Sequence, residues 1–242
     1  MILAIDAGNS RIKWGAYRDG SWISTGAVAN DQLPALTSAL SAIPKPDKIA
    51  ISNVAGERMR VGLAETLARL SMDMHWVKPE RERCGVKNNY ADPAKLGSDR
   101  WAALIAARHL QRGPVVVVNA GTALTVDALT ESGEFLGGLI VPGIKLMLHS
   151  LTTGTAHAHA PHGEFVAFPA NTLDAIYSGA MNAALGSIER VVAALSAREG
   201  ASVNCIFSGG AAPALMPHLA VNAVEVPNLV LQGLVALVES AP

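Results

Sequence analysis

The first residues of the chain could bind a phosphate group through a metal ion. An apolar run ends at Asp6, a turn over residues 7–10 (Ala-Gly-Asn-Ser) follows, and Arg11 and Lys13 come directly behind it. A glycine turn lets backbone N–H groups approach a ligand, because no Cβ stands in the way. A carboxylate beside a phosphate needs a cation between them, as Mg²⁺ provides in phosphoryl transfer. The stretch favours a loop that grips nucleotide phosphates with Mg²⁺; the alternative is an ordinary hairpin with a surface acid.

A second stretch repeats this pattern nearly half a chain length later. When "LAIDAGNSRIKWG" is aligned with "VVVNAGTALTVDA", the identical Ala-Gly pairs coincide, and the aligned pairs are Asp6 and Asn119, Ala7 and Ala120, Gly8 and Gly121, Asn9 and Thr122, and Ser10 and Ala123. In both copies an apolar strand delivers a small polar turn, and an alternating strand follows. The repeat predicts two related halves, each offering a glycine turn to a shared cleft.

The elements around these turns predict an α/β protein. Apolar strands alternate with segments of helical periodicity, including a helix expected over residues 100–111 and an early hairpin broken at Asp19-Gly20. The strongest strand signal is "VVVVNAGTALTVDAL", after Gly113-Pro114. We expect the two halves to span residues 1–112 and 113–242.

Composition excludes several classes of protein. Half of the 242 residues are apolar, 16% are charged and the formal net charge is -1, which gives no electrostatic basis for binding nucleic acid or an anionic membrane. Cys84 and Cys205 lie far apart, which argues against a disulfide framework and a zinc site. Asp6 interrupts the first apolar run, so no signal peptide is expected, and no apolar run reaches the ~20 residues of a membrane span. We therefore expect a cytoplasmic protein.

Three familiar nucleotide or hydrolase motifs are missing. No GxGxxG follows a strand, and no GxSxG is present. The glycines at 138 and 143 resemble a Walker A loop, but Lys145 comes one residue late and Leu146 replaces the Ser or Thr. These alternatives to the two repeated turns are therefore unsupported.

Five motifs together resemble the type III pantothenate kinases. They are "DAGNS" at 6–10, "GSDR" at 97–100, "NAGTALT" at 119–125, "GGLIVPG" at 137–143 and "NTLDAIYSG" at 171–179. The resemblance implies a duplicated RNase H-like fold of the actin-like ATPase type, with two related halves around a nucleotide cleft. It also implies ATP-dependent phosphorylation of pantothenate, the first step of coenzyme A biosynthesis, with Mg²⁺ as cofactor.

The resemblance assigns roles to individual residues. It implies that Asp99 is the general base and that Asp6 binds Mg²⁺ directly or through water. The implied ATP-binding residues are Asp6, Ala7, Gly8, Asn9, Ser10, Arg11, Ile12 and Lys13, with Thr122 from the second turn. The implied pantothenate-binding residues are Tyr90, Gly97, Ser98, Asp99 and Arg100, with Thr172 reaching across the interface of a homodimer.

The chemistry of these residue types is compatible with those roles, and each has a structural alternative. A carboxylate such as Asp99 can accept the proton of an attacking hydroxyl, but Asp is also favoured as a helix N-cap. The guanidinium of Arg100 pairs well with a carboxylate, or it lies on a helix surface. Tyr90 is either a wall of the ligand site or an anchor of its loop.

The chain departs from the family pattern at one position. The family has Asp where this sequence has Asn119, and that Asp binds an activating K⁺ or NH₄⁺. Asn keeps a carbonyl oxygen but loses the charge, which weakens a site for a hard cation. We predict reduced or absent dependence on monovalent cations. Asp127, further along the same strand pair, is expected on an exposed strand face.

Other interpretations remain. His157, His159 and His162 suggest a metal site, but their Ala- and Pro-rich surroundings favour a solvated loop. The same fold could phosphorylate another small hydroxy acid, or serve as a nucleotide-binding regulatory protein without turnover. A protein without turnover has no need of the base, so Asp99 favours the kinase.

Overall fold

A computed structural model describes residues 1–154 and 163–240 of the chain. The contacts divide the chain into two compact units: unit 1 is Met1–Gln111 together with Asn228–Pro242, and unit 2 is Arg112–Pro227. Within the described ranges, no helix is long and apolar enough to cross a membrane.

Unit 1 is built on a sheet with the strand order β3-β2-β1-β4-β5. The strands are β1 (Ile2–Ala7), β2 (Arg11–Arg18), β3 (Ser21–Ala29), β4 (Lys48–Asn53) and β5 (Met74–Trp76). The first three form an antiparallel meander, and β4 and β5 run parallel to β1. Asp19 and Gly20 both have positive φ, 51° and 82°, as the tight hairpin turn expected between β2 and β3 requires.

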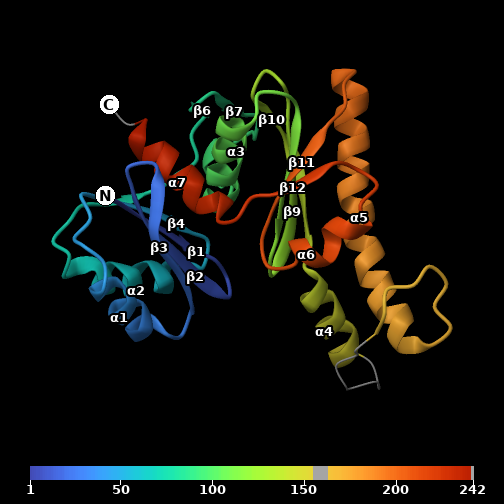
Figure 1. Cartoon of the computed structure of the whole chain (residues 1–242), viewed down its shortest axis with the longest axis horizontal. Helices are drawn as coiled ribbons and strands as arrows, with labels where there is room; N and C mark the ends of the chain where they lie inside the picture. Colours follow the sequence, from blue (N-terminus) through green and yellow to red (C-terminus); the bar gives the residue numbers. More distant parts are fainter. Residues whose placement is uncertain (155–162, 241–242) are drawn as a thin grey trace. The chain divides into compact units, whose positions relative to one another are not determined.

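Helices cover both faces of this sheet. Helices α1 (Leu33–Ser41) and α2 (Glu57–Ala68) close one apolar core with β1, β2 and β4 (Figure 1). Helices α3 (Ser98–Leu110) and α7 (Leu229–Glu239) pack against each other and against β4. A Cβ on Gly233 of α7 would lie 1.8 Å from the carbonyl oxygen of Ala102, so the glycine allows the two helices to touch.

A short irregular segment of unit 1 links β5 to α3. It contains the hairpin of β6 (Glu82–Arg83) and β7 (Val86–Asn88) and the 3₁₀ turn η1 (Pro93–Lys95). This segment carries Tyr90 and leads directly into the start of α3.

Unit 2 repeats the strand order of unit 1. Its strands are β8 (Val115–Ala120), β9 (Ala123–Leu129), β10 (Glu134–Pro142), β11 (Asn204–Ser208) and β12 (Ala223–Glu225), in the order β12-β11-β8-β9-β10. Strands β8, β9 and β10 form an antiparallel meander, and β11 and β12 run parallel to β8. In both units the first three strands form the meander, and the fourth and fifth strands lie on the other side of the first strand. The expected duplicated α/β fold is confirmed.

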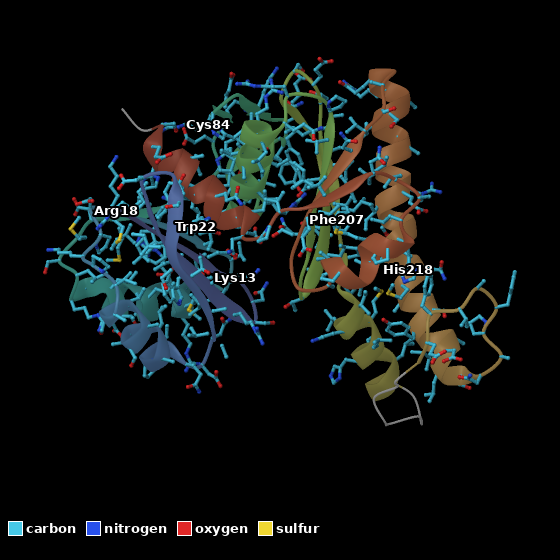
Figure 2. All side chains as sticks on the ribbon, in the orientation of Figure 1. Lys13, Arg18, Trp22, Cys84, Phe207 and His218 are labelled. Atoms are coloured by element: carbon cyan, nitrogen blue, oxygen red, sulfur yellow. The ribbon has the colours of Figure 1, made fainter. Side chains whose placement is uncertain are left out.

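The helices of unit 2 follow its sheet. The long α5 (Thr172–Glu199) runs beside the sheet, and α4 (Ile144–Gly154) follows the end of β10 and packs mainly against α5 (Figure 1). Helix α6 (Ala212–Leu215) and the 3₁₀ turn η2 (Met216–His218) follow β11. Phe207 of β11, labelled in Figure 2, is fully buried in the apolar core between sheet and α5.

The structure differs from the sequence prediction in three details. Helix α7 groups with unit 1, whereas the expected boundary at residues 112 and 113 counted it with the second half. The second turn is one residue shorter than the first: Gly8 N–H bonds Arg11 O, but Gly121 N–H bonds Ala123 O, so Ala123 corresponds to Arg11 and not to Ser10.

The third detail is Asp127, which is fully buried, so the expectation of an exposed face is wrong. Successive residues of β9 from Leu124 to Leu129 are all buried. Both faces of the strand are therefore covered, and alternation of apolar and polar residues does not report exposure there.

Candidate active site

The first glycine turn joins β1 to β2 and is held by its own backbone. Gly8 N–H donates to Arg11 O at 3.1 Å, and the side-chain amide of Asn30 donates to Gly8 O at 2.9 Å. Asn9, Ser10 and Arg11 are exposed at the tip. Asn30 therefore stabilises the turn through Gly8 O, and the residues at the tip of the turn remain exposed.

Asp6 lies directly under this turn, in the middle of the sheet. It pairs with Lys13 of β2 on one side and with Ser52 of β4 on the other. Figure 2 labels Lys13 on its strand. The three residues share one position along neighbouring strands, so a carboxylate, an amine and a hydroxyl converge at the edge that carries the turn.

The electrostatic environment of Asp6 is unfavourable for a bare carboxylate. Burial raises its pKa to about 7, the negative charge of Asp99 adds to that effect, and Lys13 and a hydrogen bond from Ser52 oppose it. Its Oδ1 atom is buried and has no hydrogen-bond partner within the described residues. A bound cation would satisfy that oxygen and relieve the repulsion between the two carboxylates, so Asp6 fits a divalent metal ion.

Asp99 comes from the first turn of α3. Gly97 is the N-cap of this helix, so Asp99 is not the capping residue that the structural alternative required. Its Oδ1 accepts a hydrogen bond of 2.8 Å from Arg100 N–H, and a Cβ on Gly97 would lie 2.5 Å from the same oxygen. Burial raises the pKa of Asp99, while the N–H and the charge of Arg100 lower it. Gly97 thus makes room for the carboxylate at the helix start.

A hydroxyl bridge joins the two carboxylate-bearing elements. Ser52 Oγ lies 2.9 Å from Ser98 Oγ, and both residues are buried. Because Ser52 also bonds Asp6, it connects the end of β1 to the start of α3. The sequence analysis did not single out Ser52; its place in "ISN", at the end of a predicted strand, was the only signal available.

Tyr90 and Arg100, which the resemblance assigns to the same substrate, are in contact. Arg100 Nη1 donates to the Tyr90 hydroxyl at 2.9 Å, and the guanidinium carbon lies 5.8 Å from the ring centroid. Arg100 is only 4% exposed, so it is not an ordinary residue of the helix surface. Unit 1 therefore brings together Asp6, Lys13, Asp99, Arg100 and Tyr90 around the end of its sheet.

The second glycine turn, in unit 2, is supported by two glycines from elsewhere in the chain. Gly143 N–H donates to Thr122 O at 2.9 Å, and a Cβ on Gly143 would lie 2.2 Å from Gly121 O. A Cβ on Gly209 would lie 2.5 Å from Ala120 O. The glycine that ends "GGLIVPG" is thus required to support the turn, and Thr122 is exposed on it.

Asn119 holds the place in unit 2 that Asp6 holds in unit 1. It pairs with Thr125 of β9 and with Ser208 of β11. Thr125 Oγ1 is buried and has no hydrogen-bond partner among the residues described. The side chains here offer neutral oxygens only and lack the carboxylate charge of Asp6, which makes the place less favourable for a hard cation. In the described ranges, no group of three or more His, Cys, Asp or Glu residues could hold a metal ion.

Thr172 is the first residue of α5. The Asn171 side chain caps this helix by accepting from Asp174 N–H at 2.9 Å. Thr172 lines an apolar groove of about 460 Å³ between α4 and α5, together with Met147, Leu151 and Ile176. Of the residues predicted for other sites, His157, His159 and His162 lie outside the described residues.

Comparison with known families gives one clear match. The family model described as type III pantothenate kinase matches residues 2–194. A type III pantothenate kinase of Nitrosospira multiformis is 45% identical over 98% of this chain and 90% of its own length. One of Aromatoleum aromaticum is 46% identical over 97% of this chain and 96% of its own.

Solved structures support the fold. A structure named as a conserved putative Baf family transcriptional activator from Campylobacter jejuni has a TM-score of 0.62 at 23% identity, covering 98% of this chain and 97% of its own. A putative 2-dehydro-3-deoxygalactonokinase from Sinorhizobium meliloti has a TM-score of 0.62 at 18% identity, covering 99% of both chains. At these identities the likeness concerns the fold alone.

Proposed function

The chain belongs to the type III pantothenate kinase family, and from this premise we propose that it phosphorylates pantothenate with ATP, the first step of coenzyme A biosynthesis. The single observation that carries the proposal, beyond family membership, is the convergence of Asp6, Asp99 and Arg100 at the end of one sheet. The reaction needs an acid that holds the metal ion at the phosphates and a second acid that accepts the hydroxyl proton. It also needs a cation that binds the carboxylate of the substrate.

Asp99 acts as the general base. The hydroxyl oxygen of pantothenate forms a bond to the γ-phosphorus of ATP, and the bond from that phosphorus to its bridging oxygen breaks. ADP leaves with the electron pair, and the hydroxyl proton passes to an oxygen of Asp99. The raised pKa of Asp99 supports this role, because a carboxylate with a higher pKa is a stronger base and accepts the hydroxyl proton more readily near neutral pH.

The first turn holds the phosphates of ATP. Asn9, Ser10 and Arg11 are exposed at its tip, and Lys13 supplies a cation from the next strand. Asp6 would hold Mg²⁺ through the oxygen that has no partner, directly or through water. When bound, Mg²⁺ neutralises charge on the transferring phosphate. Thr122 contributes from the second turn.

The substrate side is formed by the start of α3 and the loop before it. Gly97, Ser98 and Asp99 bind near the reacting hydroxyl, and Arg100 with Tyr90 orients the carboxylate end of pantothenate. The hydrogen bond between Arg100 and the Tyr90 hydroxyl supports this role, because it sets the direction of the guanidinium before substrate arrives.

We also propose a homodimer in which Thr172 reaches the partner's pantothenate. The groove that Thr172 lines is apolar, and Leu146, Leu151 and Leu173, on the two helices that form it, are each more than 40% exposed. A second copy packing over α4 and α5 would bury them. A cytoplasmic location is proposed with it, since Cys84 and Cys205 are both free thiols.

The proposal is tested by assaying pantothenate phosphorylation with ATP and Mg²⁺, with wild type beside Asp99→Asn. Loss of the base should reduce kcat about 10²–10⁴-fold while ATP still binds. Asp73→Asn, which alters an exposed acid on the same unit, is the matched control and should keep wild-type activity. If the wild type binds ATP but leaves pantothenate unmodified, the substrate assignment is wrong; if Asp99→Asn turns over normally, the base is wrong.

A further inference from the structure

Arg81, which precedes the short hairpin of unit 1, binds three backbone carbonyls of the loop that follows it. Its Nη1 donates to Asn88 O at 2.9 Å and to Tyr90 O at 2.9 Å, and its Nη2 donates to Ala91 O at 3.2 Å. The guanidinium thus spans the segment 88–91 from one side. All three acceptors are backbone carbonyls, so this contact consists of directional hydrogen bonds from one guanidinium and not of an ion pair.

Asn88 binds the same segment from inside. It is fully buried, its Oδ1 accepts from Tyr90 N–H at 3.1 Å, and its Nδ2 donates to Pro93 O at 3.2 Å. Its own backbone N–H donates to Arg81 O at 2.9 Å, in return for the bond that Arg81 Nη1 donates to Asn88 O. Arg81 and Asn88 are therefore connected in both directions, and we call them the Arg81–Asn88 clamp.

The clamp engages both backbone polar groups of Tyr90. The Tyr90 N–H is bonded to Asn88 and its carbonyl to Arg81, while its hydroxyl accepts from Arg100. The backbone of an irregular loop is normally its most mobile part, because no helix or sheet ladder satisfies it. Here side chains replace that ladder at the one loop residue whose hydroxyl contacts Arg100.

We propose that Arg81 and Asn88 are positioning residues for pantothenate binding: by fixing the backbone of Tyr90, they set the direction of the Arg100 guanidinium. The inference rests on the proposed function for the identity of the substrate, but its geometric part concerns Tyr90 alone. Lys cannot take the place of Arg81, since a single ammonium cannot reproduce a planar fork that donates to three separate carbonyls.

The kinetic test compares Arg81→Met and Arg81→Lys with wild type. Both variants should lower kcat/KM for pantothenate about 10- to 100-fold through a higher KM, with the KM for ATP unchanged, because a displaced loop misorients only the substrate side. Arg83→Met is the matched control: this arginine lies on the same hairpin, makes no side-chain hydrogen bond to the described part of the chain, and should leave both constants unchanged. Rescue by Arg81→Lys, or equal increases in both KM values, would overturn the proposal.

A double-mutant cycle identifies the route of the effect. If Arg81 acts through Tyr90, adding Arg81→Met to Tyr90→Phe should lower kcat/KM for pantothenate much less than Arg81→Met does in the wild type. The reason is that the hydroxyl that the clamp positions is already absent. Additive losses would show that Arg81 acts elsewhere.

A spectroscopic readout separates this inference from the proposed function. The chain has three tyrosines, so ¹⁹F NMR of fluorotyrosine-labelled protein gives three signals, and Tyr90→Phe assigns one of them. Arg81→Met should shift or broaden the Tyr90 signal and leave those of Tyr17 and Tyr177 in place, whether or not pantothenate is the substrate. An unchanged Tyr90 signal in a folded variant would overturn the clamp, whereas absent turnover in wild type would overturn only the function.

Discussion

The two glycine turns are anchored to their sheets in the same way, but they differ by one residue in length and in their chemistry. Ala7 O accepts from Val54 N–H, and Ala120 O accepts from Ala211 N–H, each at 3.0 Å, so each turn is tied to the loop after the parallel strand in the same way. Below the first turn lies a buried carboxylate, Asp6; below the second lies the neutral Asn119. The two units thus share the frame of the turn, while the residue beneath it is an acid in unit 1 and a neutral amide in unit 2.

The difference extends to what surrounds each residue. The charge of Asp99 disfavours the ionised form of Asp6, whereas Lys13 and the hydrogen bond from Ser52 favour it. At the matching position Asn119 pairs with Thr125 and Ser208, which carry no charge. A carboxylate held under strain of this kind is typical of functional sites, where stability is lost in exchange for reactivity.

The largest expected effect follows from making the first turn like the second. Asp6→Asn should reduce kcat about 10³-fold, because the loss of a metal-binding carboxylate removes several kcal/mol of charge stabilisation. The measurement is steady-state turnover of pantothenate at saturating ATP and Mg²⁺, with the exposed Asp31→Asn as control. Near-normal turnover of Asp6→Asn would mean that the two turns are chemically interchangeable.

The same substitution should stabilise the metal-free protein at alkaline pH. The folded pKa of Asp6 is about 7, above its unfolded value, so its protonated form favours folding below the unfolded pKa and that contribution is lost as pH rises through 7. Asp6→Asn should therefore exceed wild type in free energy of unfolding by up to about 4 kcal/mol at pH 8, with no difference near pH 3.

Urea unfolding across this pH range, with a chelator present, measures the difference. A constant offset between the two proteins at every pH would contradict the assignment of the shift to Asp6. The corresponding Asn119→Asp variant provides the comparison in unit 2.

The support under the turns should differ in its tolerance of a methyl group. Gly143→Ala places a Cβ 2.2 Å from Gly121 O and should destabilise the protein by about 1–3 kcal/mol, whereas Gly8→Ala meets only Arg11 O at 3.5 Å. Chemical denaturation measures both, and Gly8→Ala should change stability by less than about 1 kcal/mol. Equal costs would indicate that both turns are equally crowded.

The smallest expected effect concerns the monovalent cation. Wild type should show little or no activation by K⁺ over Na⁺, because Asn119 offers a neutral oxygen. Asn119→Asp should increase the activation by up to about tenfold, equivalent to about 1.4 kcal/mol. Titration of turnover with KCl, with NaCl as control, measures this activation. Steep activation of wild type would show that the backbone and Thr125 suffice to hold the ion.

Features that depend on short stretches of chain could be predicted from the sequence. The strand before each turn, the hairpin at Asp19-Gly20 and the start of α3 next to Asp99 all follow from local patterns of apolar residues and glycine. The one-residue difference between the turns could not be predicted, because an alignment without gaps places Ser10 on Ala123 and only the hydrogen bonds of Gly8 and Gly121 show the true register.

The class of this protein follows from local sequence patterns: two copies of a strand and glycine turn, an acid beneath one of them, and five motifs in family order. Tertiary structure decided which distant side chains support them. Ser52 reaches Asp6 through a parallel strand pair, Asn30 braces Gly8, and Arg81 holds Tyr90 by its backbone. Turns and strands are encoded by neighbours in sequence, whereas buried hydrogen bonds and pKa values arise from residues that only folding brings together.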